Sequence, residues 1–270
     1  MEDVPAQTSM HSLGIDLASQ PGDTGACLIH WAGGTGSVLE VQPGPLTDEA
    51  LLELMSAPAV LKVGIDAPFG WPLAFIDAVS AYRDATSWLP LPHEEIRFRA
   101  TEALVARETG QAALSVATSD LAWPAMRCAR LLSQMASAGQ ALDRTGYGLV
   151  AEVYPAAALR RWGLIPEGVS PGQWSYKGKG ADRRARRREI LDGLLGRTTG
   201  SLELPSGFEE RCEESDDVLD ALLSALVARA VAVGESDPIP RGMGWVALRE
   251  GWIHLPRVGS LERLSAVPSS

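Results

Sequence analysis

The stretches LGIDLA, residues 13–18, and LKVGID, residues 61–66, are the most informative about the fold, because each is a short apolar run that carries an aspartate. Asp16 lies within the first run, and Asp66 closes the second just before Pro68 stops the strand. The near-continuous apolar character of residues 61–66 is typical of a central strand buried on both faces. These two runs predict an α/β fold with carboxylates at the ends of its strands.

The segments around these runs predict a mixed sheet. Residues 26–31 (ACLIHW) and 37–41 (SVLEV) have strand character, and glycine-bounded loops join them to the first strand as in an antiparallel meander. A helix with Thr47 as its N-cap leads into the strand at 61–66, and residues 149–154 (LVAEVY) give another strand. We expect three antiparallel strands followed by parallel strands, flanked by helices.

The same order predicts the domain organisation. We expect a single domain over residues 11–258, with a helical insertion at about 69–148 that contains helices near 72–84, 100–109 and 124–141. Residues 251–256 (GWIHLP) are expected to form an edge strand. Residues 1–10 and 259–270 are expected to be flexible tails.

The composition limits the classes of function. The net charge of −10 means that the average field of the protein does not attract a polyanion, so a nucleic acid partner needs a local basic patch. The three cysteines lack any Cys-x-x-Cys spacing, which argues against a thiolate zinc site and a disulfide framework, and favours a reducing cytoplasm. No apolar run is long enough to span a membrane, so no membrane partner is expected, and no oligomeric state is predicted.

Five acidic residues form the candidate site. Asp16 and Glu152 lie within apolar strands and Asp66 ends one, and a carboxylate there is costly to bury unless it is paired or binds a metal. Asp217 and Asp220 stand three residues apart in the amphipathic helix expected at 216–233, and therefore share one of its faces. That face borders the leucine stripe of the helix, so a helix packed on the sheet could aim both acids at the strand ends.

Carboxylates without histidine or cysteine favour hard cations, so the expected cofactor is Mg²⁺ or Mn²⁺, held by Asp16, Asp66, Asp217 and Asp220. Two such ions can clamp the attacking and leaving oxygens of a phosphodiester. Each acid also has a structural interpretation. Asp217 lies in the first turn of its helix, where the helix dipole favours acids, and Glu152 could be paired within the sheet.

These residues lie in motifs that resemble the domain-of-unknown-function family numbered 429, described as predicted nucleases with a ribonuclease H fold. The resemblance implies a ribonuclease H-like fold and a hydrolase. It implies that Asp16 and Asp66 are the strand acids of that fold and that Asp217 and Asp220 are its late-helix acids. The motifs run in the family's order along nearly the whole chain: GIDLA (14–18), GIDAPFGWP (64–72), FRATE (98–102), AEVYPAAA (151–158), SYKGK (175–179), DDVLDALLSALVARA (216–230) and EGWIHLP (250–256).

One dense basic segment offers contacts to phosphate. Residues 175–188 (SYKGKGADRRARRR) hold seven Lys or Arg against one Asp, which equally fits a solvated helix face. The predicted substrate-binding residues are four members of this segment and one arginine of the insertion: Lys177, Lys179, Arg183, Arg187 and Arg99.

The leading hypothesis is a metal-dependent nuclease or phosphodiesterase whose partner is a nucleic acid or nucleotide substrate. A second is an ATP-dependent phosphotransferase or ATPase of the actin-like core, which shares the first-strand acid. A third is a non-catalytic binding protein that retains the fold. Its sign would be carboxylate oxygens more than about 8 Å apart, too far for ions that lie roughly 3.5–4 Å from one another.

Overall fold

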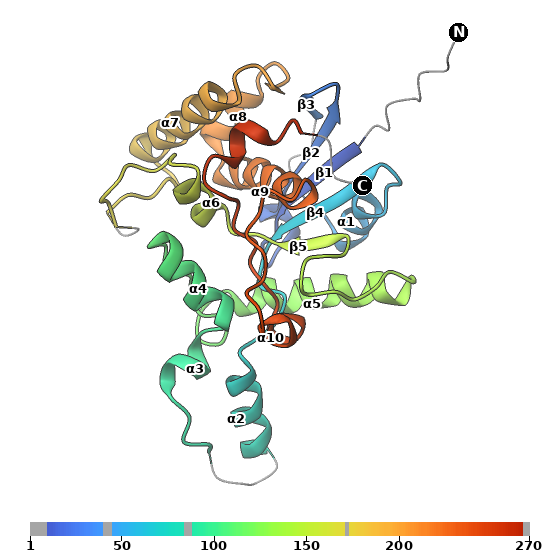
Figure 1. Cartoon of the computed structure of the whole chain (residues 1–270), viewed down its shortest axis with the longest axis vertical. Helices are drawn as coiled ribbons and strands as arrows, with labels where there is room; N and C mark the ends of the chain where they lie inside the picture. Colours follow the sequence, from blue (N-terminus) through green and yellow to red (C-terminus); the bar gives the residue numbers. More distant parts are fainter. Residues whose placement is uncertain (1–9, 40–44, 84–87, 171–172, 267–270) are drawn as a thin grey trace.

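A mixed sheet forms the centre of the computed structural model, which describes residues 10–39, 45–83, 88–170 and 173–266 (Figure 1). Within these residues, six strands are ordered β5-β4-β1-β2-β3-β6. Strands β1, β2 and β3 are antiparallel neighbours, β4 and β5 run parallel to β1, and β6 pairs in parallel with β3. The strands are β1 Met10–Asp16, β2 Gly25–Ala32, β3 Thr35–Leu39, β4 Val60–Asp66, β5 Val150–Glu152 and β6 Leu202–Glu203.

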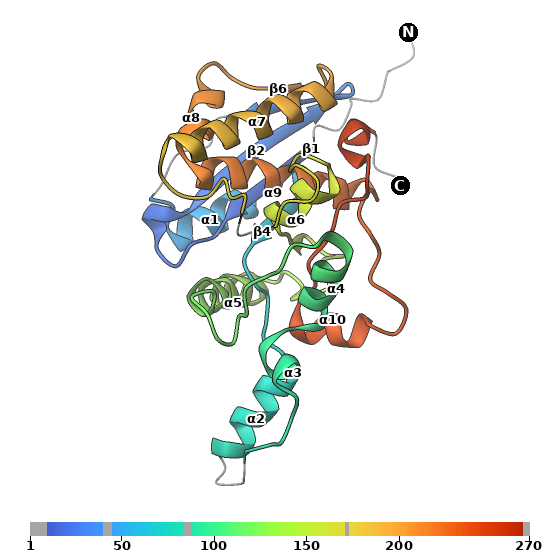
Figure 2. The ribbon, with the colours of Figure 1, turned by 90° about the vertical axis from the view of Figure 1, so that its left-hand side faces the viewer.

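Helices cover both faces of this sheet (Figures 1 and 2). One face packs against α9 (Asp216–Ala232), around which lie α6 (Pro155–Arg161), α7 (Ala181–Thr198) and α8 (Phe208–Glu214). The other face packs against α1 (Asp48–Met55) and α5 (Ala122–Ser137). The predicted α/β class, with three antiparallel strands, then parallel strands, and flanking helices, is therefore confirmed.

The alternation of side chains along β1 and β4 separates the two faces. Leu13 and Ile15 join Val63 and Ile65 in a buried apolar cluster with α1 and α5. The intervening residues of both strands point to the opposite face, toward α9. Because every second residue faces α9, the aspartates that close β1 and β4 lie on the α9 side of the sheet.

The insertion is helical, as expected, and part of it projects from the body. Its helices are α2 (Leu73–Arg83), α3 (His93–Arg97), α4 (Ala100–Thr109) and α5. Figures 1 and 2 both show α2 and α3 extending away from the sheet, while α4 lies beside α10 (Gly244–Glu250). Helices α3, α8 and α10 and strand β6 are additions to the elements expected from the sequence.

The C-terminal segment is more ordered than the sequence suggested. Ile253 forms a single parallel bridge with Glu152, so residues 251–256 extend the β5 edge as an isolated contact instead of a full strand. Leu261 and Leu264 are buried in the core beside the 3₁₀ helix Ser260–Arg263. The expected tail at 259–270 is thus wrong over 259–266, because these two leucines have apolar partners. Met10, the last residue of the expected tail at 1–10, is the first residue of β1. Residues 1–9 and 267–270, and the end of the third expected strand at 40–41, lie outside the described residues.

In the described part of the chain, no helix is both long enough and apolar enough to span a bilayer.

Candidate functional site

Three of the predicted acids meet at one end of the sheet. Asp16 and Asp66 are register partners at the ends of the parallel strands β1 and β4, and both side chains are partly exposed. Asp220, one turn into α9, is fully buried. One carboxylate oxygen from each of the three residues lies within 4.8 Å of the others. The structure therefore brings together Asp16, Asp66 and Asp220, each from a different element.

Two glycines make this meeting possible. Gly14 and Gly64 stand two residues before the aspartates, on the same face of their strands, and α9 packs directly on them. A Cβ on Gly14 would lie 2.1 Å from the backbone of Ala221 and Ala225, and one on Gly64 would lie 2.5 Å from the Ser224 carbonyl oxygen. Each Gly-Ile-Asp motif therefore supplies space for the helix and a carboxylate beside it.

Burial and crowding favour the protonated form of these acids. Burial raises the pKa of Asp66 to about 7, and the charges of Asp220 and Glu152 add to the rise. Burial also raises the pKa of Asp16 and of Asp220, and mutual repulsion contributes at Asp16. Carboxylates held together in this way gain most from a cation.

Lys177 supplies a positive charge at this cluster. Although 45% of its side chain is exposed, its ammonium group forms an ion pair with Oδ2 of Asp220. The Tyr176 hydroxyl donates to the other carboxylate oxygen of Asp220 at 2.6 Å. Burial opposes the charge on Lys177, but the facing carboxylates outweigh it and raise the pKa of the ammonium group. The predicted substrate-binding residue Lys177 thus lies directly at the acids.

Asp217 lies at the margin of the cluster. It is in the first turn of α9, whose N-cap Ser215 accepts a hydrogen bond from the Val218 amide. Burial, followed by the charge of Asp216, raises the pKa of Asp217. Its carboxylate is outside the group of three that share oxygens within 4.8 Å. Asp217 therefore lies near the site, but its position in the first turn of a helix is also one that acidic residues commonly occupy.

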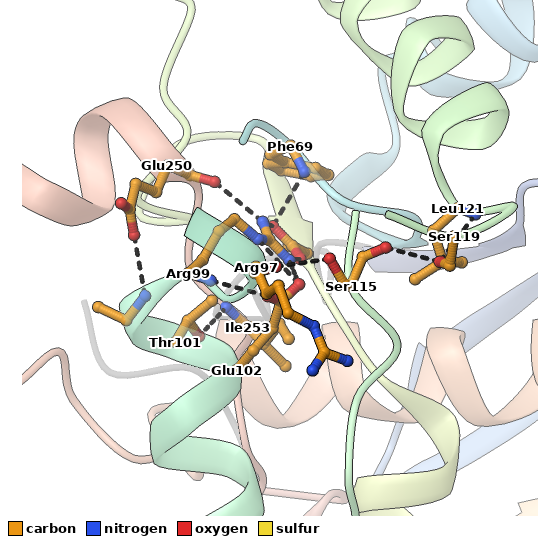
Figure 3. A network of polar contacts seen from close by, with 12 residues as sticks. Phe69, Arg97, Arg99, Thr101, Glu102, Ser115, Ser119, Leu121, Glu250 and Ile253 are labelled. Carbon is orange, nitrogen blue, oxygen red and sulfur yellow. Dashed lines mark hydrogen bonds and ion pairs between the residues drawn. The ribbon is translucent and has the colours of Figure 1, made fainter. Parts of the chain in front are cut away.

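Glu152 is held in a buried ion pair and not in the acid cluster. Its two carboxylate oxygens accept from the Arg99 guanidinium at 2.6 and 2.9 Å, and one of them also accepts from the Phe69 amide at 3.0 Å (Figure 3). This arrangement corresponds to the paired interpretation of a strand acid. The sequence offered a signal for it, since a buried glutamate needs a cation and FRATE contains one.

Arg99 is similarly committed to internal contacts. It is 1% exposed, and its five N–H groups donate to Glu102, Glu152 and the backbone carbonyl of Glu250 (Figure 3). Glu102 in turn accepts from the Arg99 amide. Arg99 was predicted to bind substrate. Instead, its side chain joins α4, β5 and the last residue of α10, and retains no N–H for a ligand.

The basic segment divides between internal and exposed roles. Arg187 is buried and donates to the carbonyls of Tyr176 at 2.7 Å and of Glu213 at 2.8 Å, so it fixes the turn that carries Lys177. Arg183 donates to the Ser175 carbonyl. Lys179 and Arg183 also line a separate hollow of about 340 Å³, together with Arg186. The structure thus uses Arg187 as a support and leaves Lys179 and Arg183 at the surface.

A pocket of about 460 Å³ opens beside the acids. Asp16 and Asp66 lie in its wall with Lys177, and the rest of the lining is largely apolar. This volume lies within the range of roughly 300–1,000 Å³ that is typical of small-molecule sites.

One comparison with known proteins assigns the chain to a family. A family model described as protein of unknown function (DUF429) matches residues 14–243, which include both strand aspartates and all of α9. The chain belongs to the DUF429 family. No curated protein and no solved structure matches the chain. The DUF429 assignment confirms the predicted family, and the acid cluster gives this member a candidate site.

Proposed function

We propose that this DUF429 protein is a Mg²⁺- or Mn²⁺-dependent hydrolase of phosphodiester bonds, a nuclease or phosphodiesterase of ribonuclease H-like fold. The supporting observation is the convergence of Asp16, Asp66 and Asp220 with one oxygen each inside 4.8 Å. The order of the strands and the position of α9 support the ribonuclease H-like part of the proposal. The pocket beside the acids gives a substrate access to them.

The donor set fits a hard divalent cation. Three carboxylates from three rigid elements, without histidine or cysteine, match the preference of Mg²⁺ and Mn²⁺ for oxygen ligands. When bound, such an ion would polarise the phosphoryl group and lower the pKa of a water molecule. In this proposal Asp217 assists from the margin of the site, and Lys177 orients a phosphate oxygen once its pairing with Asp220 is exchanged.

The rival hypothesis of a non-catalytic protein required carboxylates too far apart to share an ion. The separation of 4.8 Å is shorter than the threshold of about 8 Å set by a two-ion site, and this supports the catalytic proposal. The actin-like alternative predicts that ATP is bound or hydrolysed, so ATP is included among the test substrates.

The test is hydrolysis by the full chain. Labelled single- and double-stranded DNA, RNA, ATP and other nucleotides are incubated with Mn²⁺, with Mg²⁺ or with EDTA. We expect cleavage that EDTA abolishes. Asp66→Asn and Asp220→Asn should each lower the rate by more than the roughly 10–100-fold that is typical of outer-shell substitutions. Asp192→Asn, on the exposed surface of α7, is the matched control and should retain the rate.

Two results would contradict the proposal. One is the absence of metal-dependent cleavage of every substrate. The other is cleavage that persists unchanged in Asp66→Asn, because this substitution removes a central carboxylate while keeping the shape of the side chain.

A further inference from the structure

The pocket has a composition that the acid cluster alone does not explain. Its lining leads from Asp16 and Asp66 to apolar side chains contributed by strand ends, by the insertion and by the segment before α7. The larger apolar members are Leu17, Leu114, Leu121, Ile165, Trp174 and Ile253. A site that only had to hold a phosphate and a metal ion would need none of these side chains.

One apolar residue at the rim of the pocket remains exposed to water. Leu114 is 62% exposed, although it lines the pocket. Single exposed leucines are common, but this one stands in continuity with a concave apolar wall. An apolar ligand group in the pocket would bury Leu114 and remove its surface from water.

A few polar groups in the same wall could read the edge of such a ligand. The Gln111 amide donates to the Tyr154 hydroxyl at 3.2 Å, and this hydroxyl donates to the Ala112 carbonyl at 3.1 Å. Gln111 and Tyr154 both line the pocket. Apolar walls with a small number of oriented polar groups are the usual composition of small-molecule sites.

The cations of the pocket do not suit a long polyanion. The only lysine or arginine side chains that line it, among the described residues, are Lys177, which pairs with Asp220, and Arg99, whose N–H groups are all engaged. Glu102 and Glu152 add acidic groups to the wall. A polymer would place its neighbouring phosphates near these acids without a track of cations, whereas nucleic acid affinity depends mainly on such contacts.

From these features we infer that the substrate is a small phosphodiester, such as a cyclic nucleotide or a dinucleotide, whose planar, nucleobase-sized group enters the apolar part of the pocket. Its phosphodiester group then reaches Asp16 and Asp66. This inference rests on the proposed function for the chemistry at the phosphoryl group, but the recognition of the planar group stands on the pocket itself.

The test compares two ligands that differ only by the ring. Binding of adenosine 5′-monophosphate and of ribose 5-phosphate to the full chain is measured by calorimetry with Mn²⁺ present. A short single-stranded DNA oligonucleotide is titrated at several salt concentrations. We expect the ring-bearing ligand to bind at least about tenfold more tightly than ribose 5-phosphate, because the ring buries apolar surface.

Leu114→Asp places a charge at the apolar rim and should abolish most of this tenfold ratio. Val258→Asp is the matched control, since Val258 is 70% exposed and lies outside the lining of the pocket. It should leave the ratio unchanged. Circular dichroism spectra and unfolding midpoints establish that both variants are folded before binding is compared.

Three results would overturn the inference: equal binding of the two ligands, no detectable binding of either, or an unchanged ratio in Leu114→Asp. Tight binding of the oligonucleotide with a salt dependence that indicates several phosphate contacts would also overturn it. Failure of the proposed function has a different signature. In that case the ring is still preferred, but no phosphodiester is hydrolysed with Mn²⁺.

Discussion

Replacement of Gly14 by alanine tests how the acids are brought together. Gly14 lies in the central strand β1, where α9 crosses the sheet with its backbone against the strand. The new methyl group would lie 2.1 Å from the Ala221 carbonyl oxygen and from the Ala225 amide nitrogen. Both are backbone atoms of a helix, so neither can rotate away as a side chain would.

The cost follows from this distance. Ordinary contact begins at 3.4 Å, so α9 would have to withdraw by about 1.3 Å. A gap of roughly 0.5–1 Å already removes a quarter to a half of a dispersion contact, and overpacking a core costs about 1–3 kcal/mol or more. Because the clash involves rigid backbone, we expect a loss of at least about 3 kcal/mol from a total stability of about 5–15 kcal/mol.

Urea unfolding followed by circular dichroism measures this loss. Gly196→Ala is the control, because a Cβ on Gly196 in α7 meets nothing within 4 Å, and alanine should stabilise the helix there by about 0.5–1 kcal/mol. A loss below about 1 kcal/mol in Gly14→Ala, with an unchanged dependence on urea, would show that α9 does not depend on close approach to Gly14. Gly14→Ala should also weaken Mn²⁺ binding, since α9 carries Asp220.

Three further predictions concern charge. In EDTA, the unfolding free energy of Asp66→Asn minus that of the wild type should rise as the pH increases from 3.8 to about 7. The raised pKa of Asp66 means that the folded wild type still holds a proton over this range, whereas the unfolded chain has lost it. The wild type therefore loses stability at this group as the pH rises, and Asp66→Asn does not. Urea titrations at several pH values check this, and a pH-independent difference would contradict it. Mn²⁺ affinity should increase over the same range, with proton release that calorimetry in buffers of different ionisation enthalpy detects; a constant affinity would show that the acids are already ionised. Glu152→Gln should cost about 3 kcal/mol by leaving Arg99 partly unpaired in the interior, whereas Glu235→Gln, which loses an exposed pair, should cost less than about 1 kcal/mol by the same assay.

The sequence predicted the parts of this site that depend on strand and helix periodicity. Asp16 and Asp66 close apolar runs, and Asp220 borders a leucine stripe, so local pattern was enough to place them on one side of a sheet. The same pattern places Gly14 and Gly64 on the face of the sheet that carries Asp16 and Asp66, because residues two apart in a strand share a face. The sequence did not indicate how closely α9 approaches these glycines, because that distance is set by tertiary packing.

Pairing among buried charges was harder to predict from the sequence. Glu152 and Asp66 both lie in apolar strand segments, so the sequence around them does not distinguish their roles. The difference comes from Arg99 of the insertion, which forms an ion pair with Glu152. Arg187 is a different case. It lies three and four residues before the buried Ile190 and Leu191, so helical periodicity already placed it on the inward face of α7.

The contacts of Arg99 join segments that are far apart in the sequence. Its guanidinium joins α4 to β5 and to the carbonyl of Glu250, and Ile253 then bridges to Glu152 and lines the pocket. The acids of β1 and β4 therefore leave the ribosome long before the last part of the pocket wall exists. Contacts between residues so distant in sequence form slowly, because a long loop must close first. The pocket wall is therefore complete only when the segment that contains Ile253 has docked beside β5.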